Sequence, residues 1–462
     1  MKSDPPKPIL GTRNGSAREG CAILSPMDIA RPPFLCFPAV RRLFGKSEPM
    51  KSTERVAIFL ILSVICWNVC GCTAARVYTD DAQPFLAALR TDNAESALAY
   101  ADAYVRQTTA PGRAKQNKYL ALLERGKIAL SAGRYDQCIA DLQEAERRFL
   151  MLEGTISLTE GFGSILTDDT AREYEAEMHE KLMISPYLVL AYLGKGDFEG
   201  AVVERNRTIS KIHQYIEERE ERGYLENPFA RLLSAVMYEM ESKPDDAKIE
   251  YRKMKWEAES ERLEKKENST DLVILIDTGL APHKRQIKWG PFPIVARDRV
   301  VNLGFAYASY EPTPSAVSRC HISVDGNPMG AAGLLYDLEN TVLTQYQKNK
   351  QAIISKMVAR LTVKAAAQVS AHAAADRVSK DNPQLGSLLR LMADISGAVW
   401  IAVEQADLRG WTTLPGKIHY LRVSGLAPGE HRIKIDYGFG VQEKTVNLEK
   451  DKIGIAHFSS AK

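Results

Sequence analysis

The sequence lacks the short motifs that identify common catalytic sites. It contains no His-Glu-x-x-His, no nucleophile elbow, no phosphate-binding loop and no Gly-x-Gly-x-x-Gly at the start of a helix. Its eight histidines are dispersed, and none has the spacing of metal ligands. We therefore expect no metal and no cofactor. An enzyme is less expected than a binding protein, although catalytic residues can come together from distant segments.

Cysteine is scarce beyond the first 71 residues. Four of the seven cysteines lie within that segment, which leaves Cys72, Cys138 and Cys320. Three cysteines cannot build the disulfide scaffold that stabilises many small secreted domains. We expect Cys138 and Cys320 to be free, buried thiols.

The chain also lacks a strong excess of charge. The whole sequence has a net charge of +3, but residues 1–71 contain ten Lys and Arg against five Asp and Glu. The remaining residues therefore have a net charge of −2. A nearly neutral chain does not have the basic surface of a nucleic-acid-binding protein, so no nucleic-acid partner is expected.

The apolar run near the N-terminus is too short to span a membrane. Val56–Val69 has 14 residues, whereas a spanning helix needs roughly 20. Met50, Lys51 and Arg55 precede this run. A basic start followed by a short apolar core indicates an export signal rather than a transmembrane anchor.

This run ends on Val69-Cys70-Gly71-Cys72, which resembles the lipobox of bacterial lipoproteins. The resemblance implies that residues 50–71 are a lipoprotein signal peptide, and that Cys72 is lipidated and becomes the mature N-terminus. It implies a membrane partner through this lipid and a location in the bacterial cell envelope. Because Thr73 rather than Asp follows the cysteine, we expect the outer membrane, with the chain facing the periplasm. Residues 1–49 are proline-rich and without period, so we expect a disordered leader that need not be translated.

Small residues and aromatics recur in residues 79–258 at the spacing of helical hairpins. One copy contains Gly126, and Gly133-Arg134-Tyr135 is expected to form the turn between its two helices. This spacing resembles the tetratricopeptide repeat (TPR), in which small residues let the two helices approach closely. Because one hairpin cannot bury its apolar face alone, neighbouring hairpins should stack. Further hairpins are expected at Phe85–Tyr104, Tyr192–Ala201 and Ala235–Tyr251.

Residues 271–459 combine short strands with a helical segment. The β-branched run Asp271–Asp277 predicts a buried strand. Residues 333–406 carry apolar side chains at helical spacing and predict a hairpin of two helices, which packs either on the strands or on the repeats. The predicted fold class is therefore α+β with several domains: TPR-like helices, then a small β-sandwich with an inserted helical hairpin. Further strands are expected at Val300–Ala308, Cys320–Val324, Lys417–Val423, Arg432–Tyr437, Gln442–Val446 and Ile453–Phe458.

Several polar and aromatic residues are candidates for partner binding. Lys127 and Ser131 lie on a helix expected to line the groove of the repeats. Glu204 and Arg207 form an i,i+3 pair, which is either a ligand contact or part of a solvated helix face. A third group lies where helix returns to strand, and either recognises a ligand or holds a loop in place: Asp407, Arg409 and Trp411.

Residues spread over most of 80–459 carry a family resemblance. They are Tyr174, Glu177, Glu180, Tyr187–Leu193, Gly196-Asp197, Ala201–Glu204, Arg207, Asn227-Pro228-Phe229, Tyr238-Glu239, Gly279–Pro282, Lys284, Ala406-Asp407, Arg409, Trp411 and Leu414-Pro415. In these residues the chain resembles an uncharacterised family of bacterial TPR-containing lipoproteins. The resemblance implies a location in the envelope and no established activity.

Three functional hypotheses remain at this point. The first is a lipid-anchored cell-envelope scaffold that binds a protein or peptide partner through TPR-like repeats. The second is an envelope enzyme or saccharide-binding protein, with a site between the repeats and the β region around Asp407, Arg409 and Trp411. The third is a structural subunit of an assembly. A groove without a catalytic motif favours the first hypothesis.

Overall fold

The structure is a computed structural model that describes most of the chain beyond residue 77. All described residues belong to one compact unit, Arg76–Lys462. The leader expected at 1–49, the signal peptide expected at 50–71 and Cys72 lie outside the described residues. The described residues are 78–110, 115–159, 172–217, 220–264, 269–296, 299–403 and 405–462.

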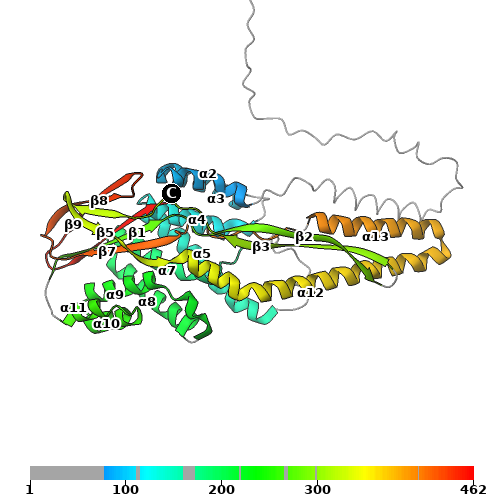
Figure 1. The fold of residues 1–462 in the computed structure, drawn as a ribbon, viewed down its shortest axis with the longest axis horizontal. Coiled ribbons are helices and arrows are strands. Elements are labelled where there is room, and N and C mark those ends of the chain that lie inside the picture. The colour runs from blue at the N-terminus through cyan, green and yellow to red at the C-terminus, as the bar shows by residue number, and fades with distance from the viewer. Residues whose placement is uncertain are drawn as a thin grey trace, which may run out of the picture. The chain divides into compact units, whose positions relative to one another are not determined.

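Helical hairpins form the first half of the described chain (Figure 1). Each hairpin reverses at a residue with positive φ, which glycine and short polar residues adopt most readily: Asp92, Gly133, Gly196 and Ser242. The hairpins are α2 (Tyr78–Arg90) with α3 (Ala94–Thr109), α4 (Lys118–Ser131) with α5 (Tyr135–Thr159), α7 (Met178–Lys195) with α8 (Phe198–Ile212), and α9 (Pro228–Met240) with α10 (Pro244–Lys253). Helix α11 (Glu257–Glu264) and the short turns Lys115–Asn117, His213–Glu217 and Glu220–Leu225 complete this region.

Glycines allow these helices to pack closely. A Cβ atom at Gly126 would lie 2.8 Å from Cδ2 of Leu142, so α4 and α5 approach each other only because this side chain is absent. Between hairpins, a Cβ atom at Gly194 would lie 2.5 Å from the ring of Tyr135. The α4–α5 hairpin and α7 therefore stack through residues that have no room for a side chain.

Two four-stranded sheets form most of the second half. The first sheet has the strand order β10-β1-β7-β6, and β1 pairs parallel with β10. The second sheet has the order β5-β4-β8-β9 and is antiparallel. Their strands are β1 (Asp271–Thr278), β4 (His321–Val324), β5 (Asn327–Ala331), β6 (Gly333–Asp337), β7 (Lys417–Val423), β8 (Gly429–Asp436), β9 (Val441–Leu448) and β10 (Ile453–Ser460).

Strand β1 joins the two cores of the molecule because its side chains alternate between the faces of the first sheet. Leu272, Ile274 and Ile276 lie in the core between the two sheets. Val273 and Leu275 lie in the core that the first sheet shares with the helices. The molecule is therefore layered in the order helices, first sheet, second sheet.

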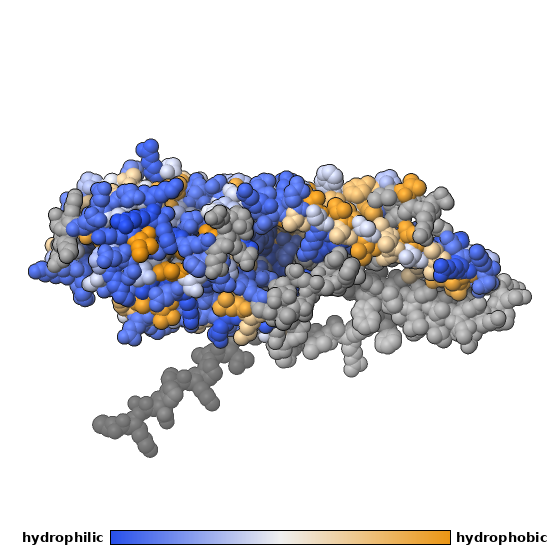
Figure 2. Space-filling model, turned by 90° about the horizontal axis from the view of Figure 1, so that it is seen from below, coloured by the Kyte–Doolittle hydropathy of each residue, from blue (hydrophilic) through white to orange (hydrophobic). Residues whose placement is uncertain are grey.

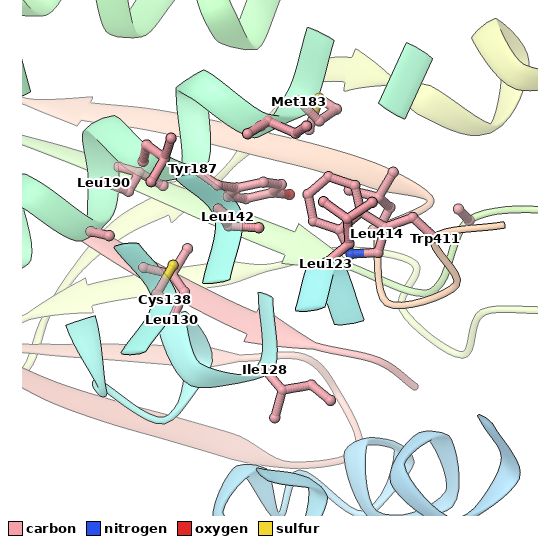
Figure 3. Close-up of a cluster of buried hydrophobic side chains, with 14 of the residues drawn as sticks. Leu123, Ile128, Leu130, Cys138, Leu142, Met183, Tyr187, Leu190, Trp411 and Leu414 are labelled. Atoms are coloured by element: carbon pink, nitrogen blue, oxygen red, sulfur yellow. The ribbon is translucent and has the colours of Figure 1, made fainter. Parts of the chain in front are cut away.

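The helix–sheet core also receives side chains from the loop 405–416. Figure 3 shows Trp411 and Leu414 beside Tyr187 of α7, with Leu123 of α4 close by. The ring centroids of Tyr187 and Trp411 are 6.2 Å apart. The first sheet and this loop therefore cover the inner side of helices α4 and α7.

A long β-ribbon and two long helices form a separate feature, which we call the arm (Figure 1). The ribbon consists of β2 (His283–Ala296) and β3 (Arg299–Glu311), and the helices are α12 (Leu338–Asp381) and α13 (Pro383–Val403). In the described residues, β2 and β3 form a two-stranded sheet that no other strand joins. Both helices lie along β3, where Phe305 lies close to Met357 and Leu361 of α12.

The mixed α+β class predicted from the sequence is confirmed, with most helices preceding the sheets. Cys138 and Cys320 are free and buried, as expected. The predicted start of the helical insertion at residue 333 is wrong, because Gly333–Asp337 forms strand β6. The helix begins only at Leu338, where the Asp337 side chain accepts a hydrogen bond from the amide of Asn340.

Helix α12 is long and α13 is apolar, which raises the question of a membrane span. Among the described residues, no helix is both long enough and apolar enough to cross a bilayer.

Candidate functional site

Lys127 is buried against the first sheet instead of facing an open groove. Only 2 % of the residue is exposed, and its amine lies 2.9 Å from Oδ2 of Asp277 on β1. The same carboxylate accepts a hydrogen bond from the Tyr187 hydroxyl at 3.1 Å and lies 3.0 Å from Nε2 of His457. Burial acts to raise the pKa of Asp277, but the charges and hydrogen bonds of Lys127 and His457 together outweigh burial and lower that pKa.

Ser131 lies one turn beyond Lys127 and is half-buried. Its hydroxyl donates a hydrogen bond to the backbone carbonyl of Lys127 at 3.3 Å. The first pair of candidate residues therefore contacts the protein's own β region and helix, and the predicted open groove at this position is filled by the first sheet.

Glu204 and Arg207 form the predicted i,i+3 ion pair on α8, with 2.6 Å between Oε1 and the guanidinium. Arg207 is half-exposed, but Glu204 is buried, so this is not a fully solvated helix face. Burial, and then the nearby carboxylate of Glu146, raises the pKa of Glu204. Beside them, Arg207, Glu146 and Lys211 line a small hollow of about 320 Å³.

Asp407, Arg409 and Trp411 come together and hold the loop 405–416 against the helices. The guanidinium of Arg409 donates to both carboxylate oxygens of Asp407, at 2.9 and 2.7 Å, and to the carbonyl of Arg172 at 2.9 Å. Arg409 and Trp411 are 5 % and 2 % exposed. Of the two interpretations of this group, the geometry favours loop fixation, since Arg409 and Trp411 are buried and Arg409 is bonded to the protein itself.

Two buried glutamates that the sequence analysis did not select as site residues complete this contact. Glu124 of α4 accepts hydrogen bonds from the backbone amides of Thr412 and Thr413, at 2.7 and 3.0 Å. Glu180 of α7 accepts one from the amide of Trp411 at 2.6 Å. Burial raises the pKa of Glu124 despite these hydrogen bonds.

Glu177, just before α7, connects the helices to the arm. It lies 2.6 Å from the amine of Lys284 on β2 and accepts a hydrogen bond from the Tyr310 hydroxyl at 2.8 Å. Burial opposes ionisation, but the charges of Lys284 and His179, with the hydrogen bonds from Lys284 and Tyr310, together lower the pKa of Glu177 to about 2. Two of the residues that carry the family resemblance, Glu177 and Lys284, thus meet in space. We call the contact made by Glu124, Lys127, Glu177 and Glu180 with their partners the seam.

A large open cleft lies at the other end of the first sheet. It has a volume of about 1360 Å³. One wall consists of the hairpin turns, with Leu193, Phe198 and Met240, and the other consists of β9 and β10. Arg422 lies at its inner end, 2.8 Å from Glu239 and 2.7 Å from Asp271, so the charged groups there neutralise each other.

Strand β10 presents unpaired backbone groups to this cleft. It is an edge strand, with β1 as its only neighbour in the described sheet. Its even-numbered carbonyls point toward β1, as the hydrogen bonds from Asp271 to Lys452 and from Gly279 to Ser460 show. The odd-numbered residues therefore direct their amides and carbonyls outward, because both groups of a strand residue point to the same side.

Side chains of β9 occupy only part of this edge. The carbonyls of His457 and Ser459 accept hydrogen bonds from Lys444 and Gln442. Within the described residues, the outward groups of Ile453 and Ile455 have no such partner. Three lysines also line the cleft: Lys444, Lys450 and Lys452. The cleft therefore offers a free strand edge, apolar side chains and amines.

The described residues contain no group of three or more His, Cys, Asp or Glu side chains that could hold a metal ion. Comparison of the chain with protein-family models, with curated proteins and with solved structures finds no match in any of the three.

Proposed function

We propose that this protein is a lipid-anchored scaffold of the bacterial cell envelope, which binds an extended segment of a protein partner in the cleft beside β10. The observation that carries the proposal is the free edge of β10 at Ile453 and Ile455, facing a cleft of about 1360 Å³. Exposed strand edges bind extended peptides through backbone hydrogen bonds, and pockets beside them select side chains. Such a site needs no catalytic residue.

We further propose that the helical hairpins are TPR-like and that the two sheets form a β-sandwich, as in the family of bacterial TPR-containing lipoproteins. The close contact of Gly126 with Leu142 supports the first part, because TPR hairpins need a small residue at such a position. The apolar core between the sheets supports the second part. The partner site then differs from the expected one, since it uses the hairpin turns instead of the inner helix faces.

The anchor in this proposal is a lipid on Cys72, and the location is the outer membrane facing the periplasm. The intact mass of the protein purified from native membranes tests this part. A mass that begins at Cys72 and includes acyl chains is the expected result. An unmodified chain that includes residues 1–71 would remove the envelope location from the proposal.

Selection from a peptide-display library on the purified full chain tests the cleft. We expect bound peptides to lose at least about tenfold in affinity with Phe198→Glu, which corresponds to ~1.4 kcal/mol. Phe198 lies in the cleft wall and is 38 % exposed, whereas Ile249 of α10 is 50 % exposed and outside the cleft. Ile249→Glu is therefore the matched control and should leave affinity unchanged.

Ile455→Pro tests the backbone pairing itself. Proline lacks an amide hydrogen, and the amide of residue 455 points away from β1, so the first sheet can still form. Loss of a hydrogen bond of this kind costs about 0.5–1.5 kcal/mol, so a decrease in affinity of roughly twofold to tenfold is expected. If Phe198→Glu and Ile455→Pro both bind the selected peptides as the unchanged chain does, the cleft is not the binding site.

A further inference from the structure

The arm differs from the rest of the chain in charge. Residues 283–311 and 338–403 contain 13 Lys and Arg against 6 Asp and Glu, an excess of seven positive charges. The other residues of 72–462 contain 38 Lys and Arg against 47 Asp and Glu, an excess of nine negative charges. The nearly neutral total thus hides a basic arm on an acidic body.

The basic residues concentrate on α12. From residue 340 to residue 375 this helix carries five Lys and Arg and no Asp or Glu. Lys348 is exposed and Lys350 is half-exposed, and neither forms an ion pair with another described residue. Charged residues on a helix that only needs solubility usually alternate in sign, so a one-sided run indicates a negatively charged partner.

The ribbon of the arm also exposes large apolar side chains. Val295 of β2 and Val300 of β3 are 74 % and 63 % exposed, and they face each other at the tip of the ribbon. Trp289 is 58 % exposed, and Ile354 and Val358 of α12 are also exposed. Figure 2 shows apolar residues gathered along the arm, whereas they are scattered singly on the rest of the visible surface. Gathered apolar side chains on a soluble surface mark a contact site.

Exposed valines, a tryptophan and a one-sided run of lysines fit one kind of partner in particular. Apolar and tryptophan side chains enter the boundary between lipid headgroups and acyl chains, and lysines bind the anionic headgroups around them. A protein partner would need carboxylates on its own surface, whereas a bilayer with anionic lipid supplies negative charge over the whole length of the arm.

We propose that the arm lies on the surface of an anionic lipid bilayer, with Val295 and Val300 inserted between the headgroups. The ribbon tip supplies apolar contact, and α12 supplies electrostatic attraction. The contact is separate from the lipid proposed at Cys72 and does not depend on it. It would fix the orientation of the cleft relative to the membrane.

Co-sedimentation with vesicles tests the proposal, using vesicles of phosphatidylcholine alone and of phosphatidylcholine mixed with phosphatidylglycerol. The full chain carries Cys72→Ser throughout, so that success or failure of lipidation at Cys72 cannot change the outcome. The apolar run Val56–Val69 is present in every variant, so the comparison is between variants and between the two lipid compositions.

We expect phosphatidylglycerol to increase binding at least several-fold, and added salt to remove that increase. Lys348→Glu with Lys350→Glu should abolish the dependence on phosphatidylglycerol. The matched control is Arg432→Glu with Lys434→Glu, two exposed basic residues at the same spacing on β8, and it should retain most of the dependence. Val295→Asp with Val300→Asp should weaken binding to the mixed vesicles at least several-fold.

All six substituted positions are on the surface, so we expect every variant to fold. Thermal unfolding of each variant checks this. The proposal is overturned if phosphatidylglycerol has no effect on binding, or if both arm variants bind as their parent does. It is also overturned if the chain self-associates in sedimentation velocity and Val295→Asp with Val300→Asp abolishes only that association. In that case the arm is an interface between copies of the chain.

Discussion

The seam and the arm contain similar charged side chains, but their surroundings differ. In the seam, Lys127 is 2 % exposed and lies 2.9 Å from the carboxylate of Asp277. On α12 of the arm, Lys348 is exposed and forms no ion pair with the described residues. A buried charge without its partner is costly, whereas an exposed charge is solvated by water. The comparison shows that a lysine among apolar neighbours in a helix indicates a buried partner within the same chain, whereas exposed lysines without such neighbours can only attract a partner from outside it.

Removal of the buried carboxylate should have the largest effect on stability. Asp277→Ala leaves Lys127 buried and unpaired, so we expect the free energy of unfolding to fall by about 3–5 kcal/mol. Asp245→Ala is the matched control, because Asp245 is 95 % exposed and pairs only with Lys248, at 3.5 Å. That change should cost less than about 1 kcal/mol. Denaturant unfolding measures both, and equal losses would mean that burial does not make the Asp277 pair more costly to break than an exposed pair.

The pH dependence of stability should report the next largest effect. The pKa of Glu177 is lowered to about 2 in the folded chain, so ionised Glu177 stabilises the fold above pH 4.5. This contribution should be lost as the pH falls from 4.5 toward 2, and it amounts to roughly 2–3 kcal/mol.

Glu177→Gln should reduce the slope of stability against pH in that window. Glu95→Gln is the control, since the Glu95 side chain is 62 % exposed and pairs with the equally exposed Arg134. The measurement is the unfolding temperature of the unchanged chain and of both variants at several pH values from 5 to 2. An unchanged slope in Glu177→Gln would show that the pair with Lys284 does not stabilise the fold.

A histidine that pairs with an exposed carboxylate should give the smallest effect and thereby sharpen the comparison. The carbonyl of Ala427 and the carboxylate of Asp325, at 2.7 Å each, raise the pKa of His431. Protonated His431 therefore adds stability below pH 6.5, and this is lost as the pH rises through the raised pKa. The gain should stay under about 1 kcal/mol because the carboxylate of Asp325 is open to solvent, with 44 % of its side chain exposed. His431→Gln should remove this gain in stability at low pH, whereas His321→Gln, on the exposed face of β4, should not. The measurement is the free energy of unfolding at pH values on both sides of 6.5. A loss well above 1 kcal/mol in His431→Gln would mean that this pair behaves like the buried pairs of the seam.

Much of the fold could be predicted from local patterns. The run Leu272–Ile276 predicted β1, and Gly133 predicted the turn between α4 and α5. Strand β6 was missed because Leu334-Leu335-Tyr336 is a short apolar run, which fits a helix and a strand equally well. Strand β2 was missed because Gly290, Pro291 and Pro293 suggest a loop. The ladder accommodates Gly290 and Pro291 through an irregular register between Trp289 and Phe292.

The site was harder to predict because it depends on contacts between distant segments. Lys127 was expected to face a groove, since nothing in the helix itself shows that β1 covers it. A signal was nevertheless present: Glu124 and Lys127 interrupt the apolar sequence of α4 at i,i+3 spacing. Charges on an otherwise apolar helix indicate buried partners. The free edge of β10 has no local signal at all, because it follows from the strand order.

That strand order has a consequence for the time course of folding. Asp271 pairs with Ile453, and Leu272 pairs with Val423, so β1 lies far ahead of both its neighbours in the chain. The helices can form early, because their contacts are local. Their inner faces, with Glu124 and Glu180, must then wait for the segment from Trp411 to Ser460. Until that segment is in place, the partly folded chain exposes the apolar and charged surface that later becomes its interior, and in this state it is most prone to aggregate.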